Sequence, residues 1–217
     1  MARSREDFVA AGLALVEQRG FDQLTSRHRG EAMGIHSTAV YRHFPQWDLL
    51  VAAVTDAMFG KVIESHRGEL EAAVDPRDRI LGIIALVRQE AVKNPELVGN
   101  LLQIAAAPAT LATPSIDTII RVTTESLRQM GLGGRNLAVA LQALESFTVG
   151  FLAQEFVGNP DHLVNRLGRR RMVGVPDLTA HAQTTDDIAS INESAFWLSA
   201  HAVLDACAAL AEPATTP

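Results

Sequence analysis

Apolar residues recur along this chain at intervals of three and four, which is the spacing of amphipathic helices. The first such segment covers about residues 3–19, where positions i, i+3, i+4 and i+7 are Phe8, Ala11, Gly12 and Leu15. Gly20 follows and is expected to end that helix. No stretch alternates strictly between apolar and polar residues, so the pattern predicts no strand. The sequence therefore predicts an all-α fold.

Two short helices are predicted next, at about 26–33 and 35–44, on either side of a tight turn at Gly34. Thr25 or Ser26 is a suitable N-cap for the first, because a side-chain oxygen there can accept a backbone N–H of the first turn. The second is expected to end before a proline, which disfavours helical backbone in the residue preceding it. This layout is typical of a helix-turn-helix.

Longer helical segments follow, separated by Gly, Pro and Asn. They are expected at about 46–73, 77–93, 96–106, 115–130, 136–157 and 186–211. The segment 158–185 has little periodicity and holds Gly, Pro, Asp and Thr with three consecutive arginines. Such a stretch is unusual inside a compact domain, and only its part near 160–168 has a partly helical pattern.

The composition is that of a soluble globular protein, with 47% hydrophobic and 20% charged residues among 217. No apolar run approaches the roughly 18 residues needed to span a bilayer, and the polar, basic N-terminus is unlike a signal peptide. We therefore expect a cytoplasmic protein with no membrane segment. Cys207 is the single cysteine, so the sequence excludes an intrachain disulfide and a cysteine-based metal cage. We expect Cys207 to be a small buried residue.

Charge becomes informative only locally, because the net charge of −6 does not by itself indicate a nucleic-acid binder. Within residues 25–43, Arg27, Arg29 and Arg42 outnumber Glu31, and three histidines lie beside them. Short polar side chains near the start of a helix in the major groove can reach base edges, while tyrosine and arginine hold phosphates. The second short helix carries such residues: Ser37, Thr38, Tyr41, Arg42 and His43.

Several elements of this region occur together at a recognisable spacing. They read GFDQLT at 20–25, GI at 34–35, AVYRHFP at 39–45 and DLL at 48–50. With this pattern, residues 5–58 resemble the DNA-binding head of the TetR family of transcriptional regulators. The remaining chain can be matched to that family only by its number of helices and, loosely, by the apolar helix containing Phe147, Gly150 and Phe151.

The resemblance implies a homodimer of about nine or ten helices per subunit. Residues 1–45 would form the helix-turn-helix domain for operator DNA, and residues 46–212 a helical domain for ligand binding and dimerisation. Val40 and Phe44 would be core residues. Positions that would face DNA are Ser26, Arg27, His36, Ser37, Thr38, Tyr41, Arg42 and His43.

Three positions depart from the family pattern. Arg29-Gly30 stands where an apolar residue and alanine are usual, and Trp47 stands where a lysine usually contacts a phosphate. The indole N–H of Trp47 could donate to a phosphate oxygen, so Trp47 is included among the candidate DNA-contacting residues. Alternatively, its ring packs back on the head beside Phe44.

Two helices of the larger domain suit a four-helix dimer interface, with two helices from each subunit. The helix at 136–157 is apolar on more than one face, which requires burial on several sides. The last helix carries a row of small residues: Ala195, Ser199, Ala202, Ala206 and Ala209. The alternative is that both helices fill the core of a monomer.

The middle helices are expected to enclose a pocket for an apolar or weakly polar molecule, since charged residues are scarce in segments 80–87, 97–116 and 137–144. Most of the apolar candidates are expected to be plain core and not pocket wall. The candidate ligand-binding residues are Leu86, Leu102, Gln103, Ile120, Phe147, Phe151 and Trp197.

No catalytic, metal-binding or cofactor-binding motif is found, so the sequence predicts no enzyme. The function it favours is a DNA-binding transcriptional regulator, a repressor released from its operator by a small molecule. The alternative is a helical small-molecule-binding or scaffold protein whose DNA-binding head has degenerated.

Overall fold

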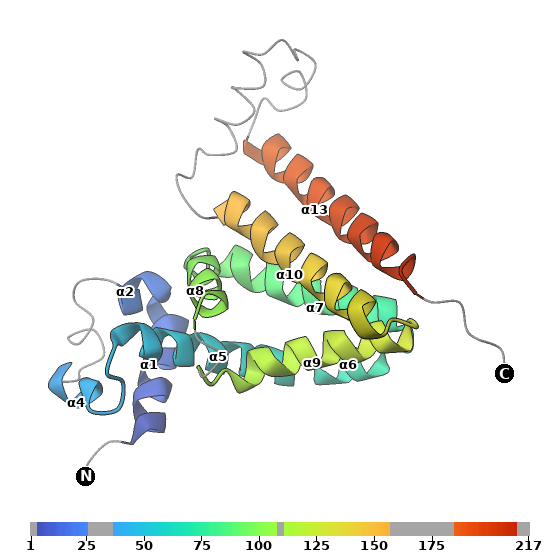
Figure 1. Ribbon diagram of the computed structural model, residues 1–217. Helices are drawn as coiled ribbons and strands as arrows, with labels where there is room; N and C mark the ends of the chain where they lie inside the picture. Colours follow the sequence, from blue (N-terminus) through green and yellow to red (C-terminus); the bar gives the residue numbers. More distant parts are fainter. Residues whose placement is uncertain (1–3, 26–36, 108–110, 157–184, 212–217) are drawn as a thin grey trace. The chain divides into compact units, whose positions relative to one another are not determined.

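The computed structural model describes residues 4–25, 37–107, 111–156 and 185–211. These residues are helical wherever they form regular structure, and none lies in a strand (Figure 1). The predicted all-α fold is therefore confirmed. The chain forms two compact units, residues 1–125 and 126–217, and the boundary falls within one helix.

Helix α1, Arg5–Arg19, matches the first predicted segment. Ser4 and Asp7 cap its start reciprocally: the Ser4 hydroxyl accepts the Asp7 N–H at 3.2 Å, and the Asp7 carboxylate accepts the Ser4 N–H at 2.7 Å. Gly20 ends the helix at a φ of 85°, which glycine adopts without steric cost. The predicted apolar face is mostly correct, because Phe8, Gly12 and Leu15 are buried.

Helix α2, Phe21–Thr25, begins directly after Gly20. Thr25, one of the two predicted caps of the next helix, is the last residue of α2, and the other, Ser26, lies outside the described residues. A helical turn places Phe21 and Leu24, three residues apart, in the core together, and both are fully buried. The predicted helix at 26–33 lies outside the described residues. Helix α4, Ser37–Tyr41, ends three residues before the predicted end at Phe44, and the predicted residues 35 and 36 lie outside the described residues.

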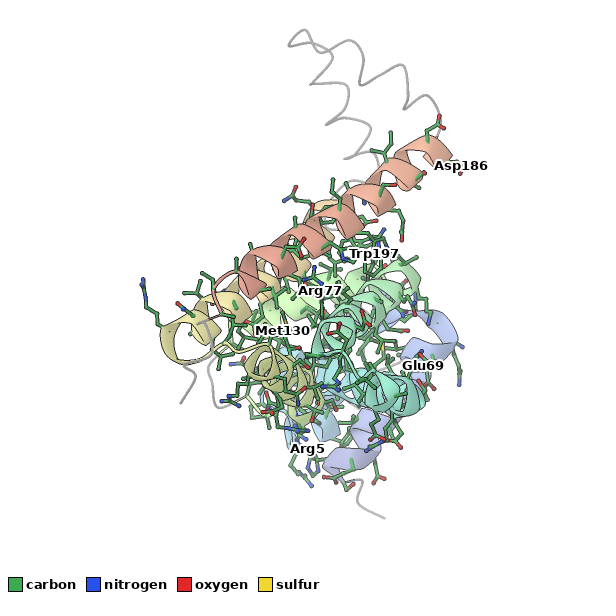
Figure 2. All side chains as sticks on the ribbon, turned by 90° about the vertical axis from the view of Figure 1, so that its right-hand side faces the viewer. Arg5, Glu69, Arg77, Met130, Asp186 and Trp197 are labelled. Atoms are coloured by element: carbon green, nitrogen blue, oxygen red, sulfur yellow. The ribbon has the colours of Figure 1, made fainter. Side chains whose placement is uncertain are left out.

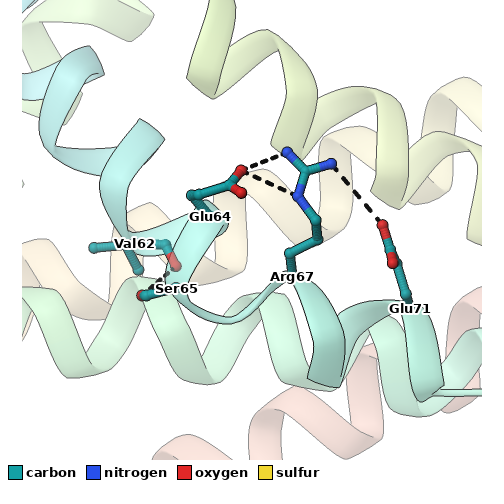
Figure 3. A network of polar contacts seen from close by, with 5 residues as sticks. All are labelled: Val62, Glu64, Ser65, Arg67 and Glu71. Atoms are coloured by element: carbon teal, nitrogen blue, oxygen red, sulfur yellow. Dashed lines mark hydrogen bonds and ion pairs between the residues drawn. The ribbon is translucent and has the colours of Figure 1, made fainter.

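The predicted helix at 46–73 is in fact two helices, α5 (Trp47–Ser65) and α6 (Arg67–Ala72), which meet at His66. The Ser65 hydroxyl donates to the Val62 carbonyl at 2.9 Å, and His66 Nδ1 lies 3.0 Å from the same oxygen. Such local bonds compete with the helical ladder. Arg67 then pairs with Glu64 before the break and Glu71 after it (Figure 3).

The remaining helices agree with their predicted ranges to within three residues. They are α7 (Pro76–Lys93), α8 (Glu96–Ala105), α9 (Pro114–Gln129), α10 (Gly134–Phe156) and α13 (Thr185–Ala208). In the first unit, α5 packs against both α1 and α8 and so lies between them. Its fully buried Leu50 and Val54 lie in that core.

In the second unit, α10 and α13 pack along one another (Figure 1). Leu144 and Leu152 of α10 and Phe196 and Leu204 of α13 are buried. Cys207 is also buried, with its sulfur 3.8 Å from the Ala140 carbonyl, and burial raises the pKa of its thiol. The prediction that Cys207 is a small buried residue is confirmed.

Among the described residues, α10 is the one helix that is long and apolar enough to cross a membrane by length and composition. This is weak evidence, because a core helix of a soluble protein can meet the same criterion. Within this chain, 22% of its most apolar 18-residue window is buried. Much of the apolar surface of α10 is therefore left uncovered by its own unit.

Candidate DNA-binding surface and small-molecule cavity

The core of the head fixes the position of α4. Val40 and Phe44 are 0% and 1% exposed, as predicted. The backbone N–H of Phe44 donates to the Val40 carbonyl at 2.9 Å, so the turn after α4 is closed by the same two core residues. The guanidinium of Arg5 lies over the Phe44 ring, 4.7 Å from its centroid. No pattern in the sequence indicated this contact of Arg5.

Two predicted DNA-facing side chains project from this core. Tyr41 is 49% exposed and Arg42 is exposed, on either side of the bend that ends α4. His43 is half-buried, with its ring centroid 5.4 Å from that of Phe8. The tyrosine and arginine therefore offer a hydroxyl and a guanidinium to an outside partner, whereas His43 is partly committed to the core.

The other predicted DNA-facing residues remain predictions. Ser37 and Thr38 are the first two residues of α4, and the structure does not describe their side chains. Ser26, Arg27 and His36 lie outside the described residues. The departures at Arg29-Gly30 lie there as well.

Trp47 packs into the head, which was the alternative to a phosphate contact. Its side chain is 5% exposed, and its indole N–H donates to the backbone carbonyl of Leu24 at 2.9 Å. A buried indole N–H that already has an acceptor is not available to a phosphate. Trp47 is thus a packing residue of the head, and its inclusion among the DNA-contacting residues is corrected.

The first unit holds a small apolar cavity among four helices. Its walls come from α5 (Phe59, Val62, Ile63), α6 (Leu70), α7 (Ile83, Leu86, Val87) and α9 (Thr118, Ile119, Val122). The Thr118 hydroxyl donates to the Pro114 carbonyl within its own helix at 2.9 Å. The cavity therefore offers a ligand almost nothing but hydrocarbon.

A second cleft adjoins this cavity, because Leu70 and Leu86 line both. It lies along α6 and α7 and is partly polar, with His66, Glu69 and Gln89 among its lining residues. Figure 2 labels Glu69 on α6. A molecule with an apolar body and a polar end would therefore find matching surfaces side by side.

The structure brings one of the seven predicted ligand-binding residues, Leu86, to the cavity. Leu102 and Ile120 are 38% and 37% exposed, and Gln103 is exposed as well. On α9 it is Ile119, one residue before Ile120, that lines the cavity. Neighbouring residues of a helix point in directions about 100° apart, so an error of one position changes the face.

The other three predicted ligand-binding residues, Phe147, Phe151 and Trp197, come together in the second unit. They surround Phe196, which is fully buried and was not predicted, with ring centroids 5.2–5.4 Å from that of Phe196. The Trp197 indole N–H donates to the Glu193 carboxylate at 2.7 Å. Figure 2 labels Trp197 on α13. These side chains pack on one another in the manner of a core.

Metal ligation finds no support in the described parts of the chain. No three His, Cys, Asp or Glu side chains there lie close enough together to hold an ion.

Comparison with known proteins extends the resemblance beyond the head, although no protein-family model matches the chain. The tetracycline repressor protein class A from transposon 1721 of Escherichia coli is 27% identical over 154 residues, which are 70% of this chain and 67% of that protein. An HTH-type transcriptional regulator of Saccharopolyspora erythraea is 24% identical over 154 residues, 71% of this chain and 61% of the regulator.

A solved structure described as "a possible TetR family transcriptional regulator from Streptomyces coelicolor A3(2)" has the same fold. Its TM-score is 0.72 at 23% identity, and the match covers 95% of this chain and all of that one. The predicted resemblance is therefore confirmed, and the fold extends it to the C-terminal helices, where the sequence alone matched little.

Proposed function

We propose that this chain, which resembles the TetR family in sequence and in fold, is a DNA-binding transcriptional regulator that acts in the cytoplasm as a repressor. The observation that carries the proposal is the construction of the head. Buried Val40 and Phe44 fix α4, while Tyr41 and Arg42 project from it. A helix held in this way can enter a major groove with polar groups outward.

Different residues of the head would contact the phosphates and the bases of the operator. Arg42 and Tyr41 would hold phosphates and set the register, and Ser37 and Thr38 at the start of α4 would reach base edges. Ser26, Arg27 and His36 would complete the surface. No catalytic step or cofactor is part of this proposal.

A second copy of the chain would supply the other half of the operator contact. Phe196, Ala200 and Leu204 of α13 are buried, whereas Ala202 and Ala206 are exposed, so the row of small residues lies on a different face. Leu198 is 74% exposed beside that row. Small side chains allow close approach of another helix, and the poorly covered α10 supplies further apolar surface. These features support a four-helix dimer interface.

The effector would be an apolar small molecule that binds in the cavity among α5, α6, α7 and α9. No unpaired polar group is evident in the described cavity wall, so binding would rest on apolar burial. Any polar end of the molecule would lie in the adjoining cleft. To release the operator, the molecule must bind the DNA-free arrangement more tightly than the DNA-bound one.

The test is selection of binding sites from random duplex DNA by the purified full-length protein at low salt. We expect enrichment of an inverted repeat with half-sites about one helical turn apart or somewhat more. Arg42→Ala should then weaken binding to all sequences and reduce the slope of log K against log salt by about 0.9 per subunit. Arg67→Ala, which removes an exposed arginine of α6, is the matched control and should leave the slope unchanged.

Failure to enrich any repeat would favour the alternative function, a small-molecule-binding or scaffold protein with a degenerate head.

A further inference from the structure

Helix α5 holds the first turn of α9 through a single carboxylate. Asp56 Oδ1 accepts the backbone N–H groups of Ser115 and Ile116, both at 3.0 Å. Asp56 is 6% exposed and lies in the middle of α5. Ser115 and Ile116 are the second and third residues of α9. The contact joins residues 59 and 60 positions apart in the sequence.

The carboxylate takes the place of a local cap. The first N–H groups of a helix lack partners within it, and the residue just before the helix usually supplies one. Here the Thr113 hydroxyl donates to the Asp117 carboxylate at 3.3 Å. Asp56 therefore caps α9 from another helix. Its negative charge faces the positive end of the α9 dipole, and hydrogen bonds to an ionised acceptor are the stronger kind.

Gly60, one turn along α5, allows the two helices to meet this closely. A Cβ at Gly60 would lie 2.8 Å from the Ser115 hydroxyl oxygen, closer than such atoms approach in proteins. The next atom, Ser115 Cβ, would be at an ordinary 3.7 Å. A side chain at position 60 would therefore force the Ser115 hydroxyl to move. We call the contacts of Asp56 and Gly60 with this turn the α5–α9 clamp.

The clamp lies next to the cavity and is continuous with the head. The same two helices supply cavity walls just beyond it, with Phe59 on α5 and Val122 on α9. At its other end, α5 is anchored in the head by the bond from Trp47 to Leu24. The Lys61 ammonium also pairs with Glu17 of α1 at 2.6 Å. One helix therefore connects the head core, the clamp and the cavity.

We propose that the α5–α9 clamp transmits occupation of the cavity to the DNA-binding head, with Asp56 as a positioning residue. This inference rests on the proposed function. The apolar walls of the cavity hold α9 without directional contacts, so a bound molecule can separate α9 from α5 there. The clamp fixes one end of α9, and the displacement is passed to α5 instead of being absorbed by free movement of α9.

The experiment fills the cavity by a substitution in its wall instead of by a ligand. Val122→Phe enlarges a cavity-lining side chain, and Ile119→Phe is the substitute if that variant does not fold. Operator affinity is measured by fluorescence anisotropy for the native protein, Val122→Phe, Asp56→Ala and the double variant. Thermal unfolding verifies that each one is folded.

We expect Val122→Phe to weaken operator binding by about fivefold or more, a typical allosteric coupling. In the Asp56→Ala background the same substitution should change affinity by less than about twofold, since contacting or coupled residues are non-additive. Asp56→Asn keeps an acceptor oxygen without the charge and should retain part of the coupling. Asp117→Asn, which alters the neighbouring carboxylate on the same turn, is the matched control and should retain all of it.

A second pair of variants tests the clamp from the Gly60 side. Gly60→Ala should reduce the effect of Val122→Phe, because its Cβ would lie 2.8 Å from the Ser115 hydroxyl oxygen and force that side chain to move. Adding Ser115→Ala removes the clashing oxygen and keeps both backbone N–H groups on Asp56, so it should restore the coupling to the level of Ser115→Ala alone, which lacks only the hydroxyl bond to Asp56. If it does not, the effect of Gly60→Ala arises within α5 and the clamp is overturned.

The remaining outcomes separate this inference from the proposed function. An equal effect of Val122→Phe with and without Asp56 overturns the clamp and leaves the regulator intact. A folded Val122→Phe or Ile119→Phe variant with native operator affinity also overturns it, because occupation of the cavity is then not transmitted. A native protein that selects no operator overturns the proposed function, and the clamp with it.

Discussion

At the scale of single residues, the motif at 39–45 contains two groups of side chains, one buried in the head and one exposed to solvent. Val40 and Phe44 are enclosed, whereas Tyr41 and Arg42 are exposed. A helical turn produces this division, because residues three to four apart share a face. Trp47, just after the motif, is buried as well, although the family pattern has a phosphate-contacting residue at its position.

We predict that Trp47→Lys destabilises the protein without creating a phosphate contact. The substitution removes a buried aromatic side chain, a change that costs about 3–5 kcal/mol for truncation to alanine, and it places an ammonium group near the core. Trp47→Phe should cost less, about 1–3 kcal/mol, since mainly the bond to the Leu24 carbonyl is lost. Urea unfolding measures both.

Gln46→Lys is the matched control for Trp47. Gln46 is exposed and its side chain makes no cap bond, so a lysine there should change stability by no more than about 0.5 kcal/mol. Equal stability of Trp47→Lys and the native protein would show that the indole is not needed for packing.

At the scale of elements, the helices are defined locally but positioned by partners distant in sequence. The break between α5 and α6 arises from side chains within one turn, Ser65 and His66, and so is a local feature. The start of α9 is different, because its capping group comes from α5. Burial raises the pKa of Asp56, and the N–H groups of Ile116 and Ser115 oppose this only partly. The ionised carboxylate is therefore held at a net cost in stability.

Because of this cost, the contribution of Asp56 to the free energy of unfolding changes with pH, and the direction of that change can be stated. The folded state holds the Asp56 proton more tightly than the unfolded state, whose carboxyl has its ordinary pKa of 3.8. Between that value and the raised one, the folded state binds more protons, so the contribution of Asp56 to the free energy of unfolding falls as pH rises. We predict that the stability difference between the native protein and Asp56→Asn declines across this window and is constant above it.

Urea unfolding of both proteins at a series of acidic pH values measures that difference, and titrating groups that do not interact with Asp56 cancel from it. Asp48→Asn, which alters an exposed carboxylate of α5, is the control, and its difference from the native protein should not show the decline attributed to burial of Asp56. A difference for Asp56→Asn that grows with pH would mean that the hydrogen bonds outweigh burial.

At the scale of the whole molecule, the proposed regulator needs a second copy of the chain. Helix α13 buries Phe196 and Leu204 against its own unit and leaves Leu198 exposed. An exposed side chain of this size next to Ala202 and Ala206 forms an apolar surface on the opposite side from the α10 contact. Surfaces of this kind mark sites of association.

We predict that Leu198→Glu or Ala206→Glu shifts the protein from dimer to monomer, because an unpaired charge buried in an interface is strongly unfavourable. The cost of about 3–5 kcal/mol corresponds to a weakening on the order of a hundredfold or more. Sedimentation velocity over a range of protein concentrations measures the change. Val74→Glu is the matched control: Val74 is 91% exposed, lies between α6 and α7, and should leave the dimer intact.

A dimer that survives both α13 substitutions would contradict this interface. Loss of the dimer in the Val74→Glu control would instead assign association to the first unit.

The sequence by itself determined the helical fold, most helix boundaries and the core of the head. The helices depend on local spacing, such as the apolar period in α1 and the glycine at position 20, whereas burial of Val40 and Phe44 was implied by the resemblance to the TetR family. Tertiary structure decided the contacts that join distant segments, such as Trp47 with Leu24 and Asp56 with the start of α9. The period of a helix indicates that a face is buried, but the partner of a polar atom depends on which helix packs there.

The same limit applies to the cavity. The sequence indicated Leu86, which lines the cavity, but it indicated Ile120 where Ile119 lines the wall. It also grouped Phe147 with Leu86 as one pocket, although they belong to different units of the chain. The same types of apolar residue fill a core and line a cavity, so the sequence does not distinguish the two roles. Only the packing of α5, α6, α7 and α9 against one another leaves space beside one set and not the other, because cavity volume is a property of several helices at once.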